Sequence, residues 1–442
     1  MRLALTDTPD LTAPATGDWL APVAGGGVTA TVSVPGSKSL TNRYLVLAAL
    51  AESNSVIRGW LRSRDTLLMV EALKALGADI DEVDGSLHIT PIDFSAQREG
   101  PPITIDCGLA GTVMRFVPPL AAATGREVIL DGDAQARVRP MSVIIDALTH
   151  LGVSITAEDN LLPMTIHAQS HLRGGHLEID ASASSQFVSG MLLTAPAMPL
   201  GIELVNRGET VPSRAHVDMT LEVLADAGVD VTEPQPEHWI VEPGLPRGLD
   251  VQVEPDLSNA AAFVAAALAT EGDVTVLDWP AHTTQAGDGF RSIVEAFGGT
   301  VTLDRHGLRV QGPKVLQAVD LDLSAIGELT PVVAALAAMA EGTSRLTGIG
   351  HLRGHETDRL SALHRELSAI GIHVVEQPTS LTITGANPHS GLWHTYNDHR
   401  MVMAGALLGL RVDGLVIENA DTVAKTLPEF TQLWEAMLSR LA

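Results

Sequence analysis

One apolar pattern recurs six times along the 442-residue chain at intervals of about 73 residues, and this repetition limits what the chain can fold into. Each copy reads as a helix that carries almost no charge beyond its first turn. A helix that is apolar on every side must be buried on every side. The copies start at markers separated by 73, 74, 73, 70 and 71 positions, which are Lys38, Gly111, Ser185, Ser258, Glu328 and His399.

A second helix pattern alternates with the first, and it is amphipathic. Five of its copies end at a glycine, a common helix stop, and two short alternating runs follow each one. The glycines are Gly77, Gly152, Gly228, Gly298 and Gly371, and a sixth amphipathic segment spans residues 429–441. Repeats of this length are too long for a solenoid. The sequence therefore predicts an α/β protein of six β-α-β-α-β-β-like units, three in each of two domains.

The first turns of the six apolar segments gather small, hydroxyl and charged residues: GSKS, GLAGT, ASSQ, DLSN, GELT and YNDHR. Helix N-termini present free N–H groups and the positive end of a dipole, so such turns suit an anion. Ordinary capping explains the hydroxyl and Asp residues, but it does not explain cations such as Lys38 and Arg400, which oppose the dipole. We expect equivalent repeats to direct all six N-termini into one anion-binding cleft between the domains.

The charge balance narrows the range of partners. The chain carries 28 basic and 53 acidic residues, a net charge of −25, which disfavours non-specific binding to nucleic acid or anionic membranes. Only four lysines occur, so a lysine inside a motif is informative; they are Lys38, Lys74, Lys314 and Lys425. We expect a monomer whose partners are small anionic molecules.

Composition also predicts the compartment. Cys107 is the single cysteine, so no intramolecular disulfide can form, which fits a reducing cytoplasm. The opening residues include Asp7 and Pro9 without an apolar segment, so we expect no secretory signal, and residues 1–27 read as a loose leader. The uncharged stretch 181–202 contains two prolines and does not read as a membrane span.

Several common site patterns are excluded. Residues 34–43, VPGSKSLTNR, resemble a phosphate-binding P-loop but lack its first glycine, and Ser37 intervenes before Lys38. This disfavours a kinase. No set of His and Cys residues has metal-ligand spacing, so we expect no metal and no cofactor.

Seven segments, in this order and spacing, resemble the 5-enolpyruvylshikimate-3-phosphate synthase family: VPGSKSLTNR, LAGTVMR, the Arg139–Pro140 pair, SASSQF, GHETDRL, TYNDHRM and AKTLPEF. The resemblance covers about residues 28–436. It implies the enolpyruvyl transferase fold, a two-domain inside-out α/β barrel that closes over its substrates. By the family pattern, one domain spans residues 36–253 and the other joins residues 28–35 to 254–442, with the active site between them.

The resemblance also implies the reaction and its residues. The enolpyruvyl group of phosphoenolpyruvate would move to the 5-hydroxyl of shikimate 3-phosphate, and glyphosate would compete with phosphoenolpyruvate. Shikimate 3-phosphate would contact Lys38, Ser39, Arg43, Ser184, Ser185, Gln186, Ser213, Glu328 and His355. Phosphoenolpyruvate would contact Lys38, Gly111, Arg139, Gln186, Arg359, Arg400 and Lys425. The catalytic residues would be Glu328 as the base at the hydroxyl, with Lys38 and Glu356 as candidates for proton transfer at C3.

Three positions depart from the residues common in the family. Glu328 stands where Asp is common, His355 where Lys is common, and Leu109 where Asn is common. We expect Glu356 and a bound phosphate to favour protonated His355 and to raise its pKa. We also expect mutual repulsion among the cleft cations to favour an open cleft until anions bind.

Two alternatives remain open at this point. The nearest is the related transferase that moves enolpyruvate onto UDP-N-acetylglucosamine, which usually carries a reactive cysteine in a mobile loop, whereas Cys107 lies elsewhere. The other is a non-catalytic anion-binding protein or scaffold. Such a protein would tolerate the loss of Lys38, Glu328 and Glu356, and all three are present.

Overall fold

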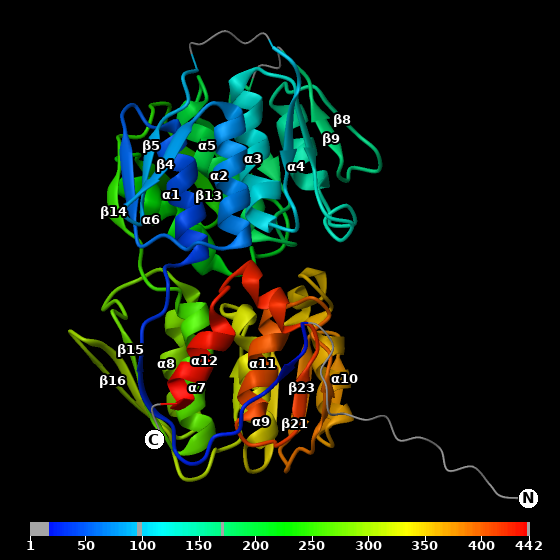
Figure 1. Cartoon of the computed structure of the whole chain (residues 1–442). Coiled ribbons are helices and arrows are strands. Elements are labelled where there is room, and N and C mark those ends of the chain that lie inside the picture. The colour runs from blue at the N-terminus through cyan, green and yellow to red at the C-terminus, as the bar shows by residue number, and fades with distance from the viewer. Residues whose placement is uncertain (1–16, 95–99, 169–171, 440–442) are drawn as a thin grey trace, which may run out of the picture.

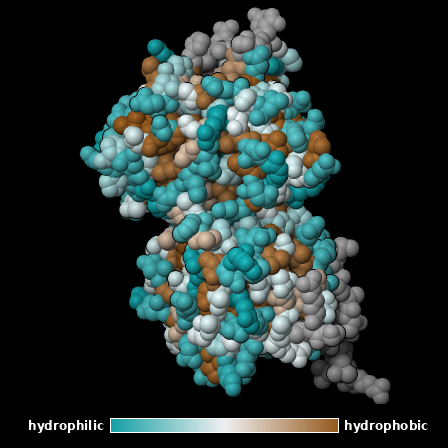
Figure 2. Space-filling model, turned by 90° about the vertical axis from the view of Figure 1, so that its left-hand side faces the viewer, coloured by the Kyte–Doolittle hydropathy of each residue, from teal (hydrophilic) through white to brown (hydrophobic). Residues whose placement is uncertain are grey.

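The computed structural model describes residues 17–94, 100–168 and 172–439, and Figure 1 shows them as two bodies stacked end to end. Each body has its own hydrophobic core. One core draws on residues 40–253, and we call this the insert body; the other draws on residues 21–34 and 257–437, and we call it the terminal body. A narrow waist separates the two bodies in Figure 2. We propose that these bodies are the two domains that the sequence predicts.

Six helices occupy the centres of the bodies, and the prediction that they are buried is confirmed. In the insert body α1, α3 and α5 pack against one another, and in the terminal body α7, α9 and α11 do the same. Their bounds are α1 Lys38–Leu50, α3 Gly111–Thr124, α5 Ser185–Thr194, α7 Leu257–Thr270, α9 Thr330–Met339 and α11 His399–Gly409. Because helices rather than strands fill each centre, the arrangement is an inside-out barrel.

Five amphipathic helices lie outside the central ones and end close to the predicted glycines. These glycines have φ between 75° and 111°, a left-handed conformation that glycine adopts without a side-chain clash. The helices are α2 Arg64–Leu76, α4 Ser142–His150, α6 Arg214–Asp226, α8 Phe290–Ala296 and α10 Arg359–Ala369. The sixth, α12, spans Phe430–Ser439, and the last residues of its predicted segment lie outside the described residues.

Each amphipathic helix except α12 leads into an antiparallel hairpin, as the alternating runs predict. The pairs are β4 Asp79–Val83 with β5 Ser86–Thr90, β8 Ile155–Ala157 with β9 Met164–Ile166, β12 Val231–Gln235 with β13 His238–Val241, β16 Thr300–Asp304 with β17 Gly307–Gln311, and β20 His373–Gln377 with β21 Ser380–Thr384.

Each hairpin joins two parallel strands to make a four-stranded sheet. The orders are β14-β3-β5-β4, β6-β7-β9-β8, β10-β11-β13-β12, β2-β15-β17-β16 and β18-β19-β21-β20. The parallel strands are β2 Thr29–Val32, β3 Ser55–Arg58, β6 Ile103–Asp106, β7 Val128–Asp131, β10 Gly175–Ile179, β11 Ile202–Asn206, β14 Asp250–Gln252, β15 Asp273–Leu277, β18 Asp320–Asp322 and β19 Thr343–Thr347. A sixth sheet has the order β1-β23-β22, from β1 Trp19–Leu20, β22 Gly391–Trp393 and β23 Leu415–Ile417.

Two of the six units take a parallel first strand that is distant in the sequence. Strand β14 supplies the first strand of the unit that contains α1, and β2 supplies the first strand of the unit that contains α7. The chain therefore crosses the waist twice, and the crossings hydrogen-bond to each other: the Ser37 amide donates to the Glu254 carbonyl at 2.8 Å and the Asp256 amide to the Pro35 carbonyl at 2.9 Å. A Cβ on Gly36 would lie 2.0 Å from the Gly59 carbonyl oxygen, so the close approach of the first crossing to the end of β3 requires glycine.

The segment before β2 differs from the prediction of a loose leader. Strand β1 pairs antiparallel with β23, Ala21 is buried, and the Trp19 indole N–H donates to Glu435 at 3.0 Å. The Trp19 ring also meets Phe430 edge-on at 6.3 Å. Residues 17–27 thus complete the sixth sheet and cover α12, while residues 1–16 lie outside the described residues. The strand has only two residues, and a run this short has no periodic pattern to detect.

No helix in the described part of the chain is long and apolar enough to cross a membrane.

We predict that Trp19→Ala lowers the free energy of unfolding by ~2 kcal/mol, because it removes an aromatic contact, a hydrogen bond and partly buried apolar surface. Urea unfolding followed by circular dichroism measures the change. Leu20→Ala is the matched control, because Leu20 is on the same strand and is 55% exposed. Equal stability of the Trp19 variant and the parent would mean that β1 adds nothing to the terminal body.

Candidate active site

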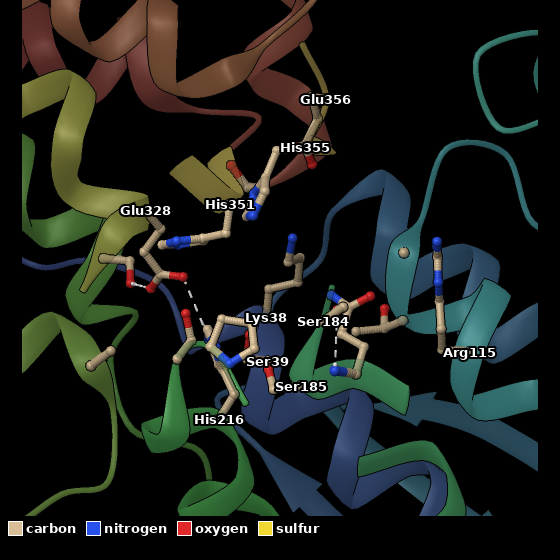
Figure 3. Close-up of a pocket in the computed structure, with 18 of the residues that line it drawn as sticks. Lys38, Ser39, Arg115, Ser184, Ser185, His216, Glu328, His351, His355 and Glu356 are labelled. Atoms are coloured by element: carbon tan, nitrogen blue, oxygen red, sulfur yellow. Dashed lines mark hydrogen bonds and ion pairs between the residues drawn. The ribbon is translucent and has the colours of Figure 1, made fainter. Parts of the chain in front are cut away.

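A cavity of about 240 Å³ lies where the two bodies meet. All six central helices reach it with their N-terminal ends, as predicted. The residues that line it there are Ser37, Lys38 and Ser39 before and on α1, Gly111 and Thr112 on α3, Ser184 to Gln186 on α5, Asp256 and Ser258 on α7, Glu328 before α9, and His399 and Arg400 on α11. Figure 3 shows side chains from both bodies facing one another across this space.

The cavity brings together most of the residues selected from the sequence. Those that line it are Lys38, Ser39, Gly111, Arg139, Ser184, Ser185, Gln186, Ser213, Glu328, His355, Glu356, Arg359 and Arg400. Two others do not line it. Lys425 ends the short helix η5 (Ala420–Lys425), is 7% exposed and reaches Glu356 instead. Arg43 lies one turn into α1 and is 1% exposed.

Arg43 supports the cavity wall from behind. Its guanidinium donates to the Ser39 carbonyl at 2.9 Å, to the Thr220 hydroxyl at 2.8 Å and to the His216 carbonyl at 2.9 Å. Burial lowers the pKa of Arg43 to about 9, against a smaller opposing effect of Glu328. With its donors occupied by the protein, Arg43 holds α1 and α6 together.

Glu328 reaches the cavity from the terminal body, on the short helix η3 (Gly327–Leu329). Ser258 donates to one carboxylate oxygen at 2.5 Å, and the His216 Nε2 of the insert body lies 3.4 Å from the other. Burial alone would raise the pKa of Glu328, but His216, Arg400, Ser258 and Lys38 together outweigh burial and lower it to about 2. The side chain is therefore an ionised carboxylate at neutral pH.

A second carboxylate, Glu356, is held between two cations. Lys425 pairs with one of its oxygens, and Arg359 donates to the other at 3.0 Å. Arg359 also donates to the fully buried Asp398 at 2.7 and 3.2 Å. Burial would raise the pKa of Glu356, but Lys425 and Arg359 hold it well below its usual range.

Asp398 links this network to α11. It is the N-cap of that helix, and its carboxylate accepts the Arg400 amide at 2.9 Å. Tyr396 and Asn397, just before it, both have positive φ, 53° and 57°, so the chain turns sharply into the helix. The turn directs Asp398 toward Arg359 and the next two residues toward the cavity.

The cations of the cavity differ in how far they are neutralised. Lys38 lies 3.4 Å from Asp65, and Arg359 has two carboxylate partners. By contrast Arg115, Arg139 and Arg400 form no ion pair with a carboxylate of the described residues, and burial lowers the pKa of Arg115 to about 9 with help from Arg139. These three are the positions best able to compensate an added anion, and the expectation that repulsion among the cleft cations favours an open cleft stays a prediction.

Four histidines line the cavity, and none of them favours the charged form: His216, His351, His355 and His399. Burial lowers the pKa of His355 to about 3, with Arg359 acting in the same direction. Glu356 does act upward on His355, as expected, but burial and Arg359 outweigh it. The prediction of a raised pKa for His355 is therefore wrong for the free protein.

Burial is also the largest influence on the pKa values of the other three histidines. Burial lowers the pKa of His216 and of His351, and it places the pKa of His399 well below its usual range with help from Arg400. Both His351 Nε2 and His399 Nδ1 are buried without a hydrogen-bond partner among the described residues.

Sequence reasoning missed several residues of the cavity. Asp65 pairs with Lys38 from α2, His216 and His351 face Glu328, and Arg115 donates to the Pro140 carbonyl at 3.1 Å. Arg115 stands inside the LAGTVMR segment, so its motif signalled it. The two histidines stand in segments without any motif, and only the fold brings them to the cleft.

Cys107, the single cysteine of the sequence, does not line the cavity. It is fully buried, and burial raises the pKa of its thiol to about 12. Within the described residues, no group of three His, Cys, Asp or Glu side chains could hold a metal ion. The absence of a metal and of a cofactor stays a prediction.

Comparison with known proteins gives a consistent result. The sequence pattern of the family "EPSP synthase (3-phosphoshikimate 1-carboxyvinyltransferase)" matches residues 23–434. A 3-phosphoshikimate 1-carboxyvinyltransferase of Kocuria rhizophila is 52% identical over 431 residues, 95% of this chain and 96% of that protein. The EPSP synthase structure from Acinetobacter baumannii has a TM-score of 0.80 at 26% identity and covers 95% of this chain and 98% of its own. The enolpyruvyl transferase NikO from Streptomyces tendae shares the fold, with a TM-score of 0.73 at 16% identity, 95% of this chain and 97% of its own.

We predict that the ligand-free protein loses stability as the pH falls below ~6.5, because the unfolded chain then binds protons on these histidines while the folded protein does not. At pH 5, about 1.5 units below the pKa of an unfolded histidine, His355 alone should cost ~2 kcal/mol. Glu328 and Glu356, whose pKa values are lowered, add their loss only at lower pH, from about 4.5 down toward 2.

Urea unfolding at pH 7.5, 6 and 5 measures this slope. His355→Asn should make the slope shallower, whereas His150→Asn, at an exposed position of α4, should leave it unchanged. The same slope in the parent and the His355 variant would show that folding does not lower the pKa of His355.

Proposed function

The chain belongs to the EPSP synthase family, and we propose that the cavity between its two bodies is where the reaction of that family takes place. The enzyme transfers the enolpyruvyl group of phosphoenolpyruvate to the 5-hydroxyl of shikimate 3-phosphate and releases phosphate, a step of the shikimate pathway. The observation that carries the proposed location is the convergence of six helix N-termini on one cavity. Both substrates are multiply charged anions, which such N-termini stabilise.

We place shikimate 3-phosphate against the insert body. Hydroxyl and amide groups of Ser184, Ser185, Gln186 and Ser213 line the cavity there and can donate to a phosphate. Lys38 stands between this group and Glu328 (Figure 3), so it can reach both substrates. Arg43 acts indirectly in this scheme, because its donors hold the wall that carries Ser39 and His216.

We place phosphoenolpyruvate beside Arg139, Arg359 and Arg400, which line the cavity. Arg139 from the insert body and Arg400 from the terminal body lack carboxylate partners among the described residues, and Arg359 lies near them. Arginine forks fit the planar carboxylate and the phosphate of such a ligand. Lys425 contributes through Glu356 rather than from the cavity surface.

The reaction then proceeds in two stages. Ionised Glu328 accepts the proton of the 5-hydroxyl as its oxygen attacks C2 of phosphoenolpyruvate, and C3 gains a proton. The tetrahedral adduct loses that C3 proton again and expels phosphate, whose charge the neighbouring cations stabilise. Lys38 and Glu356 are the candidates for proton transfer at C3. Because Lys425 and Arg359 hold the pKa of Glu356 well below its usual range, Glu356 is ionised and can accept the C3 proton in the second stage.

The transferase that uses UDP-N-acetylglucosamine is the weaker alternative. Its usual reactive cysteine has no counterpart in the cavity, since Cys107 is fully buried. The 52% identity to a 3-phosphoshikimate 1-carboxyvinyltransferase favours shikimate 3-phosphate as the acceptor.

The proposal includes a monomeric, cytoplasmic enzyme without a nucleic-acid or membrane partner. The cavity is lined by residues of one chain, so a second copy is not needed to complete it. The net charge of −25 would repel polyanions.

We predict that Lys38→Ala lowers turnover at least ~1000-fold, or ~4 kcal/mol of barrier, while the protein stays folded. Phosphate release is measured with phosphoenolpyruvate and either shikimate 3-phosphate or the UDP-sugar as acceptor. Lys74→Ala, at an exposed lysine of α2, is the control. Turnover of the Lys38 variant within about tenfold of the parent would remove Lys38 from the mechanism, and a preference for the UDP-sugar in the parent would refute the proposed acceptor.

We also predict that glyphosate competes with phosphoenolpyruvate and that Gly111→Ala weakens it. A Cβ at Gly111 would lie 2.9 Å from Gln186 Oε1 and 3.3 Å from Arg139 Nη2, so it narrows the space beside Arg139. The inhibition constant of glyphosate should rise roughly tenfold, or ~1.4 kcal/mol, with a smaller change for shikimate 3-phosphate. An equal loss of affinity for glyphosate and for shikimate 3-phosphate would mean that Gly111 has only a packing role in the fold.

A further inference from the structure

One contact of the cavity joins residues from opposite bodies. His216 belongs to α6 of the insert body, and its Nε2 lies 3.4 Å from the Oε2 of Glu328 in the terminal body (Figure 3). The second carboxylate oxygen already has the Ser258 hydroxyl at 2.5 Å, from the terminal body. Thus each oxygen of the carboxylate has one partner, and the two partners come from different bodies.

The position of His216 is fixed through its backbone. Its carbonyl oxygen accepts from Arg43 at 2.9 Å, from the Thr220 hydroxyl at 3.0 Å and from the Ser189 hydroxyl at 3.4 Å. Arg43, Thr220 and Ser189 are all buried, and they also hydrogen-bond with one another. Three donors on one carbonyl leave the start of α6 little freedom to move.

We propose that His216 is a positioning residue for Glu328: held by the buried Arg43 network, it fixes the carboxylate oxygen that Ser258 leaves free. The inference rests on the proposed function, in which Glu328 accepts the proton of the hydroxyl. A carboxylate held at both oxygens keeps its lone pairs in one orientation, which proton transfer requires.

The surroundings of the pair support this assignment. Lys38, Arg43 and Asp256 also act on His216, and Arg400 and Lys38 act on Glu328, so the pair stands among charges from both bodies. Burial, Arg43 and Lys38 lower the pKa of His216, whereas Glu328 acts to raise it. The 3.4 Å separation places the imidazole Nε2 beside the carboxylate oxygen that Ser258 leaves free, where it can orient that oxygen.

The test uses His216→Phe, which removes the donor, and His216→Gln, which keeps one. Each is made in the parent and in a Glu328→Gln background, and kcat and KM for shikimate 3-phosphate are measured. Asp218→Asn, on the same helix and outside the cavity lining, is the control. Thermal unfolding confirms that each variant is folded.

We expect His216→Phe to lower kcat about tenfold with KM changed less than about twofold, and His216→Gln to recover most of the loss. In the Glu328→Gln background, His216→Phe should change kcat less than about twofold, because its partner is already gone. The same loss in both backgrounds would overturn the proposal. So would a raised KM with unchanged kcat, which would identify His216 as a substrate contact, or full activity of His216→Phe. Activity of the parent protein itself tests the proposed reaction separately.

Discussion

The central helices can present polar groups at only one place, their N-terminal ends, because the remainder of each helix is buried among apolar neighbours. Three helices packed side by side concentrate three such ends at one face of each body, and the two faces meet at the waist. Free N–H groups buried there need acceptors, so the geometry that makes the cores also creates a site for anions. The arrangement of side chains in the cavity follows from this constraint.

Concentrating charge in such a place has an energetic cost, and the protein limits it by pairing. Asp398 compensates Arg359, Glu356 compensates both Arg359 and Lys425, and Asp65 compensates Lys38. A buried pair contributes little net stability, but the loss of one partner leaves an uncompensated charge, at ~3–5 kcal/mol. The paired groups are therefore fixed in position. Arg115, Arg139 and Arg400 form no ion pair with a carboxylate in the described part of the chain, and they are the positive charges that we propose a ligand to meet.

The sequence predicts the framework well, because its signals are local. Apolar runs and the glycines that follow the amphipathic helices define elements within a few residues, and the six markers place their ends at one cavity.

The finer features of the site depend on residues that are distant in the sequence. Arg43 turns away from the cavity because Thr220 and His216, far along the chain, surround it. Likewise His355 has a lowered pKa because burial outweighs the adjacent Glu356, and a sequence cannot report burial at a cleft. Strand β1 escaped prediction because its partner β23 lies about 400 residues away.

The two crossings of the chain between the bodies also have a bearing on biosynthesis. Strand β2 is made before any residue of the insert body, yet its partner β15 follows only after the whole insert body and the second crossing. The insert body, in contrast, has all its strands once β14 leaves the ribosome. During translation the insert body can therefore fold first, with β2 held as an unpaired edge beside it. The terminal body assembles last around strands that were made first, so a chain that has released β14 but not yet β15 holds one complete body, while β1 and β2 still lack their partners.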